Sequence, residues 1–92
     1  MLYAMFALDK AGGAEARHKA HPDHVKHIKK AGDYGVTIVS GGPLVNDDGS
    51  ASIGSIMILE AARRDAVERF NRDDPLQAAW GSVEIRRFDR KQ

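Results

Sequence analysis

The run Leu2–Leu8, LYAMFAL, constrains the fold more than any other segment, because it is continuously apolar and contains two aromatic residues. A membrane-spanning helix needs roughly 20 apolar residues, and this run is much shorter. It has neither a basic leader nor a small-residue cleavage site, so it is unlike a signal peptide. We therefore expect a strand that is buried on both of its faces.

Three more segments have the β-branched and apolar composition of strands. They are Val36–Ser40, Ile53–Glu60 and Ser82–Phe88. The stretch GGPLVNDDGSAS joins the first two of these, and its Gly, Pro and Asp content is typical of a hairpin connection. Because this Gly-rich stretch precedes a strand and not a helix, it does not fit a phosphate-binding loop.

Two helical segments lie between the strands. Pro22 interrupts the first, and proline suits the first position of a helix better than its interior. We therefore expect a short helical turn at Ala14–Lys19 and a separate helix from Pro22 to about Tyr34, closed by Gly35. The second helix is expected over Ala61–Arg72, where apolar residues recur at helical spacing.

The resulting order, β-α-β-β-α-β, predicts an α+β fold of the ferredoxin-like type over residues 1–92, as one domain. Such a fold has a four-stranded antiparallel sheet with both helices on one face. The strands LYAMFAL and IMIL are nevertheless apolar on both faces. We expect a second copy of the chain to cover the other face, giving a homodimer with sheets packed face to face.

The charge balance excludes several partners. Fourteen Lys and Arg residues against thirteen Asp and Glu residues give a net charge of +1, which provides no electrostatic reason to expect a nucleic acid or an anionic membrane. The chain has no cysteine, so disulfides, thiolate metal sites and a cysteine nucleophile are absent. A cytoplasmic location is the default expectation.

All four histidines fall in HKAHPDHVKH, at positions 18, 21, 24 and 27. Four metal ligands must converge on one point. On a helix, each step of three residues turns by about 300°, so the four rings would spread around the axis. We therefore expect no metal site.

His24 is the histidine expected to point inward, because it falls in the apolar stripe with Val25, Ile28, Ala31 and Gly32. His18, His21 and His27 are expected to take no part. Two interpretations of His24 remain open. It is either a buried structural histidine bonded to the backbone, or a general base oriented by a carboxylate. The candidate carboxylates are Asp23, Asp33, Asp73 and Asp74.

Several short motifs together resemble a known family. They are an LY strand, Arg17, HPDHV at a helix, SGGPL after the second strand, GS in the third strand and DDPL after the second helix. In this order they are similar to the YCII family (YciI-like proteins). The resemblance implies the dimeric α/β-barrel version of the ferredoxin-like fold. It also implies a His–Asp dyad, which falls here on His24 and Asp74.

The same resemblance implies a substrate pocket lined by Arg17, Ser55, Gly42 and Pro43. The chemistry it suggests is dehydrochlorination of a chlorinated hydroxyhydroquinone, a small aromatic substrate, without metal, flavin or nicotinamide. Relatives often have an aromatic residue where this chain has Leu76, which puts the substrate in question. The alternative is a non-catalytic module that binds a small metabolite in the same pocket.

Overall fold

The computed structural model describes the whole chain, Met1–Gln92. The elements are β1 (Leu2–Asp9), α1 (Ala14–Ile28), β2 (Val36–Val45), β3 (Ser52–Ala61), α2 (Arg64–Arg72) and β4 (Trp80–Phe88). A short 3₁₀ helix follows each α-helix, η1 (Ala31–Tyr34) after α1 and η2 (Pro75–Ala78) after α2. The expected β-α-β-β-α-β order is therefore confirmed.

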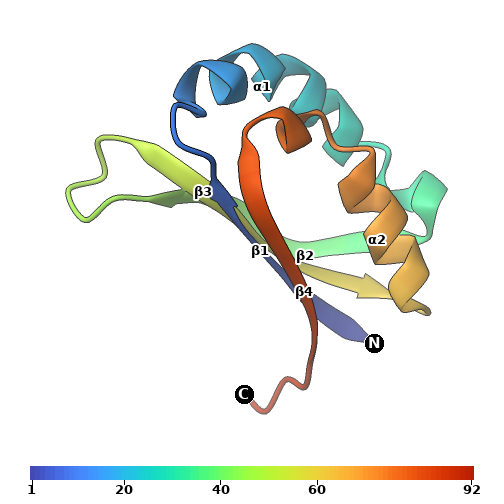
Figure 1. Ribbon diagram of the computed structural model, residues 1–92. Helices are drawn as coiled ribbons and strands as arrows, with labels where there is room; N and C mark the ends of the chain where they lie inside the picture. Colours follow the sequence, from blue (N-terminus) through green and yellow to red (C-terminus); the bar gives the residue numbers. More distant parts are fainter.

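The four strands form one antiparallel sheet in the order β2-β3-β1-β4. Figure 1 shows α1 and α2 on the same side of this sheet, as the ferredoxin-like fold requires. The first strand, β1, lies in the interior of the sheet between β3 and β4. Its side chains alternate, with Tyr3, Met5 and Ala7 buried under the helices and Phe6 and Leu8 on the opposite face.

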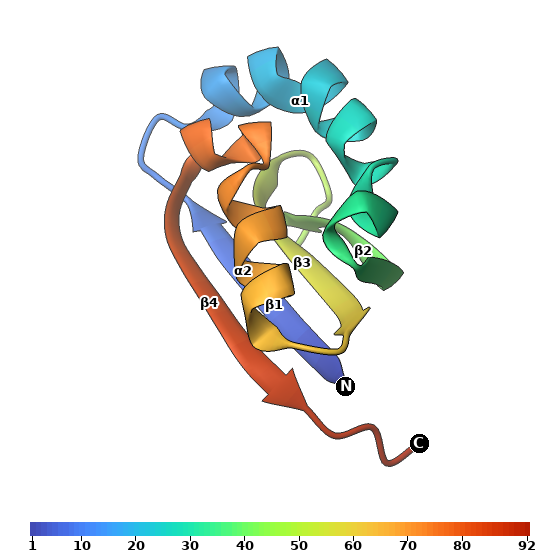
Figure 2. The ribbon, with the colours of Figure 1, turned by 90° about the vertical axis from the view of Figure 1, so that its right-hand side faces the viewer.

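The two helices cover the sheet unequally (Figure 2). Four residues of α2 are buried, including Val67 and Phe70, whereas the only buried residue of α1 is His27. The hydrophobic core therefore lies mainly beneath α2. The longer helix α1 makes few buried contacts with the sheet, which leaves room for a cavity on its inner side. Neither helix has the length and apolar character needed to cross a membrane.

The expected break at Pro22 is wrong, because α1 continues through this residue from Ala14 to Ile28. A proline within a helix removes the bond from its own amide to the carbonyl four residues earlier. Pro22 is exposed, so solvent can hydrate the carbonyl of His18 that loses this bond. The expected helix end at Tyr34 is also wrong, since α1 stops at Ile28 and η1 carries the chain to Gly35.

The second strand is longer than expected and includes Gly42 and Pro43, which the sequence placed in the hairpin connection. Pro43 lies opposite Ser55 of β3, and Gly42 lies opposite Ile56. The turn itself is confined to the residues after Val45, where Gly49 adopts a positive φ of 76°. Strand pairing, and not a flexible loop, therefore holds the Gly-Pro pair beside Ser55.

The face of the sheet away from the helices, which we call the outer face, carries an apolar patch bordered by Glu60, Glu84 and Arg86. Pairing of the strands places six large apolar residues there: Leu2, Phe6, Leu8, Ile56, Ile58 and Phe88. Phe6 and Ile56 lie directly opposite one another and are 41% and 38% exposed. An apolar surface of this kind is unusual for a sheet face in contact with water.

Candidate active site

A cavity of about 660 Å³ lies between α1 and the helix-side face of β2 and β3. Five of the six residues expected at a site line it: Arg17, His24, Gly42, Pro43 and Ser55. The sixth, Asp74, is buried directly behind His24. The structure therefore brings together residues from four elements that span nearly 60 positions of the chain.

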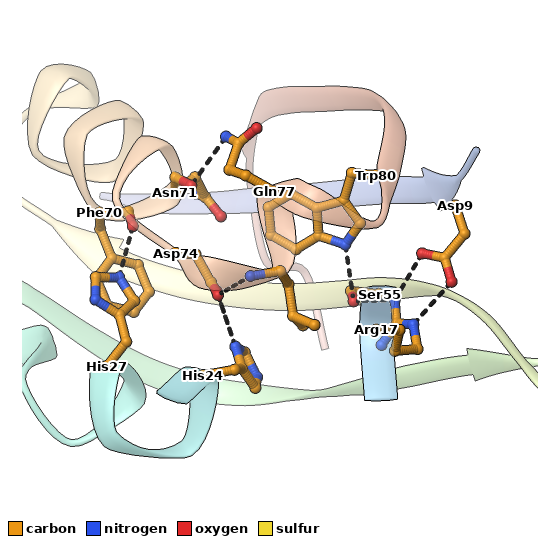
Figure 3. A network of polar contacts seen from close by, with 11 residues as sticks. Asp9, Arg17, His24, His27, Ser55, Phe70, Asn71, Asp74, Gln77 and Trp80 are labelled. Carbon is orange, nitrogen blue, oxygen red and sulfur yellow. Dashed lines mark hydrogen bonds and ion pairs between the residues drawn. The ribbon is translucent and has the colours of Figure 1, made fainter. Parts of the chain in front are cut away.

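His24 and Asp74 form a close pair at the wall of this cavity (Figure 3). Nδ1 of His24 lies 2.8 Å from Oδ1 and 3.0 Å from Oδ2 of Asp74. The Asp74 side chain is fully buried, and the His24 side chain is 18% exposed. A carboxylate accepts hydrogen bonds, so this contact places a hydrogen on Nδ1. Nε2 makes no hydrogen bond within the chain, and in the neutral imidazole with its hydrogen on Nδ1 it is the acceptor nitrogen.

The local sequence explains where the Asp74 carboxylate points. Asp74 precedes Pro75 at the start of η2, and its Oδ1 accepts a 2.9 Å hydrogen bond from the amide of Leu76. Asp74 is thus an N-cap of a helical turn, a position that Asp before Pro suits well. The same oxygen also contacts His24. One side chain therefore both caps the turn and contacts the histidine.

The other candidate carboxylates lie elsewhere. Asp23 and Asp33 are exposed on α1 and η1. Asp73 accepts a 2.7 Å hydrogen bond from the hydroxyl of Tyr34, and this bond raises the pKa of the Tyr34 phenol. Asp74 is therefore the only one of the four that contacts His24.

Arg17 is held in the cavity wall and is not a solvated surface residue. Its Nε and Nη2 donate to the two carboxylate oxygens of Asp9, each at 2.8 Å. Nη2 also donates to Oγ of Ser55 at 2.9 Å. This forked geometry fixes the plane of the guanidinium. The sequence interpretation missed Asp9, although a carboxylate that ends a buried strand, eight residues before an arginine, was an available signal.

Ser55 has a second partner that the sequence did not reveal. The indole Nε1 of Trp80 donates to Oγ of Ser55 at 3.3 Å, and both residues are buried. Ser40, a second serine in an apolar strand, lies at the outer face beside Val39 and Ile58. Of these two serines, only Ser55 is at the cavity.

Two of the remaining histidines lie closer to the site than expected. His18 and His21 line the cavity, and the His21 ring centroid lies 6.3 Å from that of His24. His27 is buried and does not line the cavity. Its ring stacks on Phe70 at 4.6 Å, and its Nε2 lies 2.7 Å from the Phe70 carbonyl oxygen. His27 therefore contributes to the packing of α1 against α2.

The apolar stripe assigned to α1 is also partly wrong, because Val25 is 40% exposed and Gly32 is exposed. The inward side of α1 is instead the side that carries Arg17, His24, His27 and Ile28. The helix begins earlier and ends earlier than expected, which changes the residues that face the sheet. No group of three or more His, Asp or Glu side chains has an arrangement that could hold a metal ion.

Comparison with known proteins places this geometry in a family. The model of the YCII-related domain matches residues 1–89. The chain belongs to the YCII-related family. Among its YCII relatives is Protein YciI of Escherichia coli O6:H1, which is 33% identical over 84 residues, covering 86% of this chain and 85% of the relative. Protein YciI of Shigella flexneri matches to the same extent.

Solved structures support the YCII fold. The 5-chloro-2-hydroxyhydroquinone dehydrochlorinase TftG from Burkholderia phenoliruptrix AC1100, in complex with 2,5-dihydroxybenzoquinone, superposes with a TM-score of 0.83. It is 24% identical, and the match covers 97% of this chain and 94% of TftG. PA3566 from Pseudomonas aeruginosa matches with a TM-score of 0.56 at 15% identity, covering 99% of this chain and 93% of that protein. At these identities the likeness shows the fold.

Proposed function

We propose that this protein is a small acid–base enzyme that eliminates HCl from a chlorinated hydroxyhydroquinone to give a hydroxybenzoquinone. The observation that carries the proposal is the 2.8 Å contact between Nδ1 of His24 and the buried carboxylate of Asp74, at the wall of a cavity of about 660 Å³. A histidine oriented in this way by a carboxylate is a general base that acts through Nε2.

The reaction needs one base and a route for chloride to leave. A hydroxyl hydrogen of the ring moves to the chlorine-bearing carbon, which gives the keto tautomer. Nε2 of His24 then takes the proton of a second hydroxyl group. The electron pair released by that O–H bond moves through the ring as a carbonyl forms, and the C–Cl bond breaks with its electron pair on chloride. The net change is the loss of one proton and one chloride ion.

The cavity suits a substrate of this size and chemistry. Its volume lies within the range of roughly 300–1,000 Å³ that is usual for sites of small ligands. Apolar side chains such as Ile38 and Met57 line it together with the polar groups of Arg17 and Ser55. The structural neighbour TftG is a 5-chloro-2-hydroxyhydroquinone dehydrochlorinase, and its structure contains 2,5-dihydroxybenzoquinone. This neighbour supports the choice of reaction, and Leu76 at the cavity wall gives this chain its own pocket shape.

The test is elimination of chloride from 5-chloro-2-hydroxyhydroquinone by the purified protein. Removal of a general base usually costs about 10²–10⁴-fold in rate. We therefore expect His24→Ala to lower kcat by that amount while circular dichroism shows a folded chain. Turnover of His24→Ala at the rate of the original protein would contradict the dyad mechanism.

A second candidate function is a binding module that holds a small metabolite without converting it. The cavity favours this function as directly as it favours catalysis. Equilibrium dialysis with 2,5-dihydroxybenzoquinone and chloride release from the chlorinated substrate separate the two. A ligand that is retained, with no chloride released during long incubation, would support the module and contradict the enzyme.

We also propose that the chain forms a homodimer through the outer face. The outer face carries an apolar patch although it lies away from both helices, and the central residues Phe6 and Ile56 of this patch are 41% and 38% exposed. Pairing two such faces removes apolar surface from water, at a gain of roughly 25 cal/mol per Å² buried. The cavity lies on the opposite side of the sheet, so each copy keeps its own dyad.

A further inference from the structure

The cavity contains a serine whose hydrogen-bonding direction is fixed by its neighbours. A hydroxyl group has one hydrogen to donate and two lone pairs that accept. Oγ of Ser55 accepts from Nη2 of Arg17 at 2.9 Å and from Nε1 of Trp80 at 3.3 Å. Guanidinium and indole nitrogens can only donate. Both lone pairs of Ser55 are therefore in use, and only its hydrogen remains.

The remaining hydrogen has no acceptor within the chain, since Ser55 donates no hydrogen bond to any protein group. Ser55 is only 5% exposed, yet it lines the cavity, so the open side of its hydroxyl is the cavity side. Figure 3 shows Ser55 between Arg17 and Trp80, with the dashed contacts converging on Oγ. The hydroxyl thus presents a donor to the cavity and not an acceptor.

The charge around Ser55 strengthens this donor. Arg17 is cationic, its Nη1 makes no bond within the chain, and no carboxylate lines the cavity. The carboxylate of Asp9 is bound to Arg17 through both oxygens. Hydrogen bonds polarise one another within a network, so a hydroxyl that accepts from a guanidinium becomes a stronger donor. The acceptor it suits best is an oxygen that carries negative charge.

We infer that Ser55 is an oxyanion-binding donor, that Trp80 is the residue that positions its hydroxyl, and that the cavity selects small compounds with an ionised oxygen. This inference rests on the proposed function, because it names the substrate class of the same cavity. His24 supplies an acceptor at Nε2, and Ser55 supplies a donor. A ligand that loses a proton to His24 and gathers charge on a second oxygen matches both groups.

The experiment uses 4-nitrophenol, whose phenol and phenolate forms differ in visible absorption and which contains no chlorine to eliminate. Titration with the full-length protein at several pH values gives the affinity of each form. We expect the protein to bind the phenolate more tightly than the phenol. Ser55→Ala removes the donor, and it should lower the phenolate preference about tenfold. Ser40→Ala, a serine at the outer face, is the matched control and should leave the preference unchanged.

Trp80→Phe tests the positioning role. It keeps an aromatic ring but frees one lone pair of Ser55, so the hydroxyl can turn and accept. We expect the phenolate preference to fall about threefold, with part of the loss appearing as tighter binding of the phenol. If Trp80 served only for packing, its replacement would weaken the binding of phenol and of phenolate equally. The ratio of the two affinities would then stay unchanged. If Trp80→Phe does not fold, the comparison of Ser55→Ala with Ser40→Ala decides the inference.

The outcomes separate this inference from the proposed reaction. A phenolate preference that falls in Ser55→Ala supports the inference whether or not chloride is released from the chlorinated substrate. If the ratio of phenolate affinity to phenol affinity is the same in the original protein and in Ser55→Ala, the inference is overturned, even when elimination of chloride is rapid. Failure of the original protein to bind the phenolate at all overturns it as well.

Discussion

His24 and Asp74 meet at 2.8 Å although they are fifty positions apart, and the same carboxylate oxygen also caps the helical turn that begins at Pro75. The local backbone geometry fixes the Asp74 side chain before any ligand binds. The imidazole therefore takes its tautomer from the fold, and its free nitrogen is available to accept a proton.

Asp74→Asn should separate the two roles of this residue. The amide oxygen of asparagine can still cap Leu76, but the carboxylate that holds the hydrogen on Nδ1 of His24 is lost. We expect kcat for chloride release to fall about 10²–10⁴-fold while the free energy of unfolding changes little. Asp74→Ala loses the cap as well, at a further cost of about 0.5–2 kcal/mol in urea denaturation.

Asp73→Asn is the matched control, because Asp73 is the adjacent residue and contacts Tyr34 and not His24. It should keep the elimination rate of the original protein. A loss of activity in Asp73→Asn as large as in Asp74→Asn would mean that the negative charge of this turn, and not its contact with His24, is what matters.

Asp9→Ala should destabilise the fold more than the loss of any exposed ion pair. The side chains of Asp9 and Arg17 are 9% and 13% exposed, so removal of the carboxylate leaves a guanidinium in a largely dry site. Such a change costs about 3 kcal/mol. Glu68→Ala is the control, since its pair with Arg64 lies at 3.4 Å with both side chains about half exposed, and pairs of that kind contribute at most about 1 kcal/mol. Equal urea midpoints for the two variants would contradict this account.

The fold could be predicted because the order of strands and helices defines the topology. The residues alone left four carboxylates open as the partner of His24, and only the resemblance to the YCII family pointed to Asp74. The exact course of α1 could not be predicted in this way. Rules for proline describe the cost to an isolated helix, and here the tertiary context tolerates Pro22 within the helix.

The contact of Trp80 with Ser55 could not be predicted for a different reason. Trp80 reaches Ser55 only after β1, β3 and β4 have paired, and the 25 positions between the two residues follow no regular spacing. Trp80 in particular has a large apolar side chain of the kind expected in a core, and most of its surface is indeed buried there. Only the geometry of its indole nitrogen connects it to the cavity.

The hydrogen bond between Tyr34 and Asp73 predicts a pH dependence of stability at high pH. The bond raises the pKa of the Tyr34 phenol above its usual value of 10.0, so the folded chain keeps this proton at a pH where the unfolded chain has lost it. The contribution is fully present below about pH 10 and is lost as the pH rises further. Tyr34→Phe should therefore show a shallower loss of stability between about pH 9 and pH 11.

Absorbance titration of the tyrosines gives an independent check of this assignment. The chain has two tyrosines, so each single Phe variant leaves one of them to titrate. In Tyr3→Phe only Tyr34 is left to titrate, and we expect Asp73→Asn in this background to lower the pKa of the Tyr34 phenol. A titration that Asp73→Asn leaves unchanged would contradict the role of the Asp73 contact.

Ile56→Glu should prevent dimer formation through the outer face. Ile56 lies in β3 opposite Phe6 and is 38% exposed, so a charge there would be buried without a partner in a face-to-face dimer. Val25→Glu introduces the same change at a valine of α1 that is 40% exposed, and it is the matched control. Light scattering at micromolar concentration should give the mass of two chains for the original protein and for Val25→Glu, and of one chain for Ile56→Glu. A single-chain mass for the original protein would contradict the dimer, and dissociation by Val25→Glu alone would place the interface on α1.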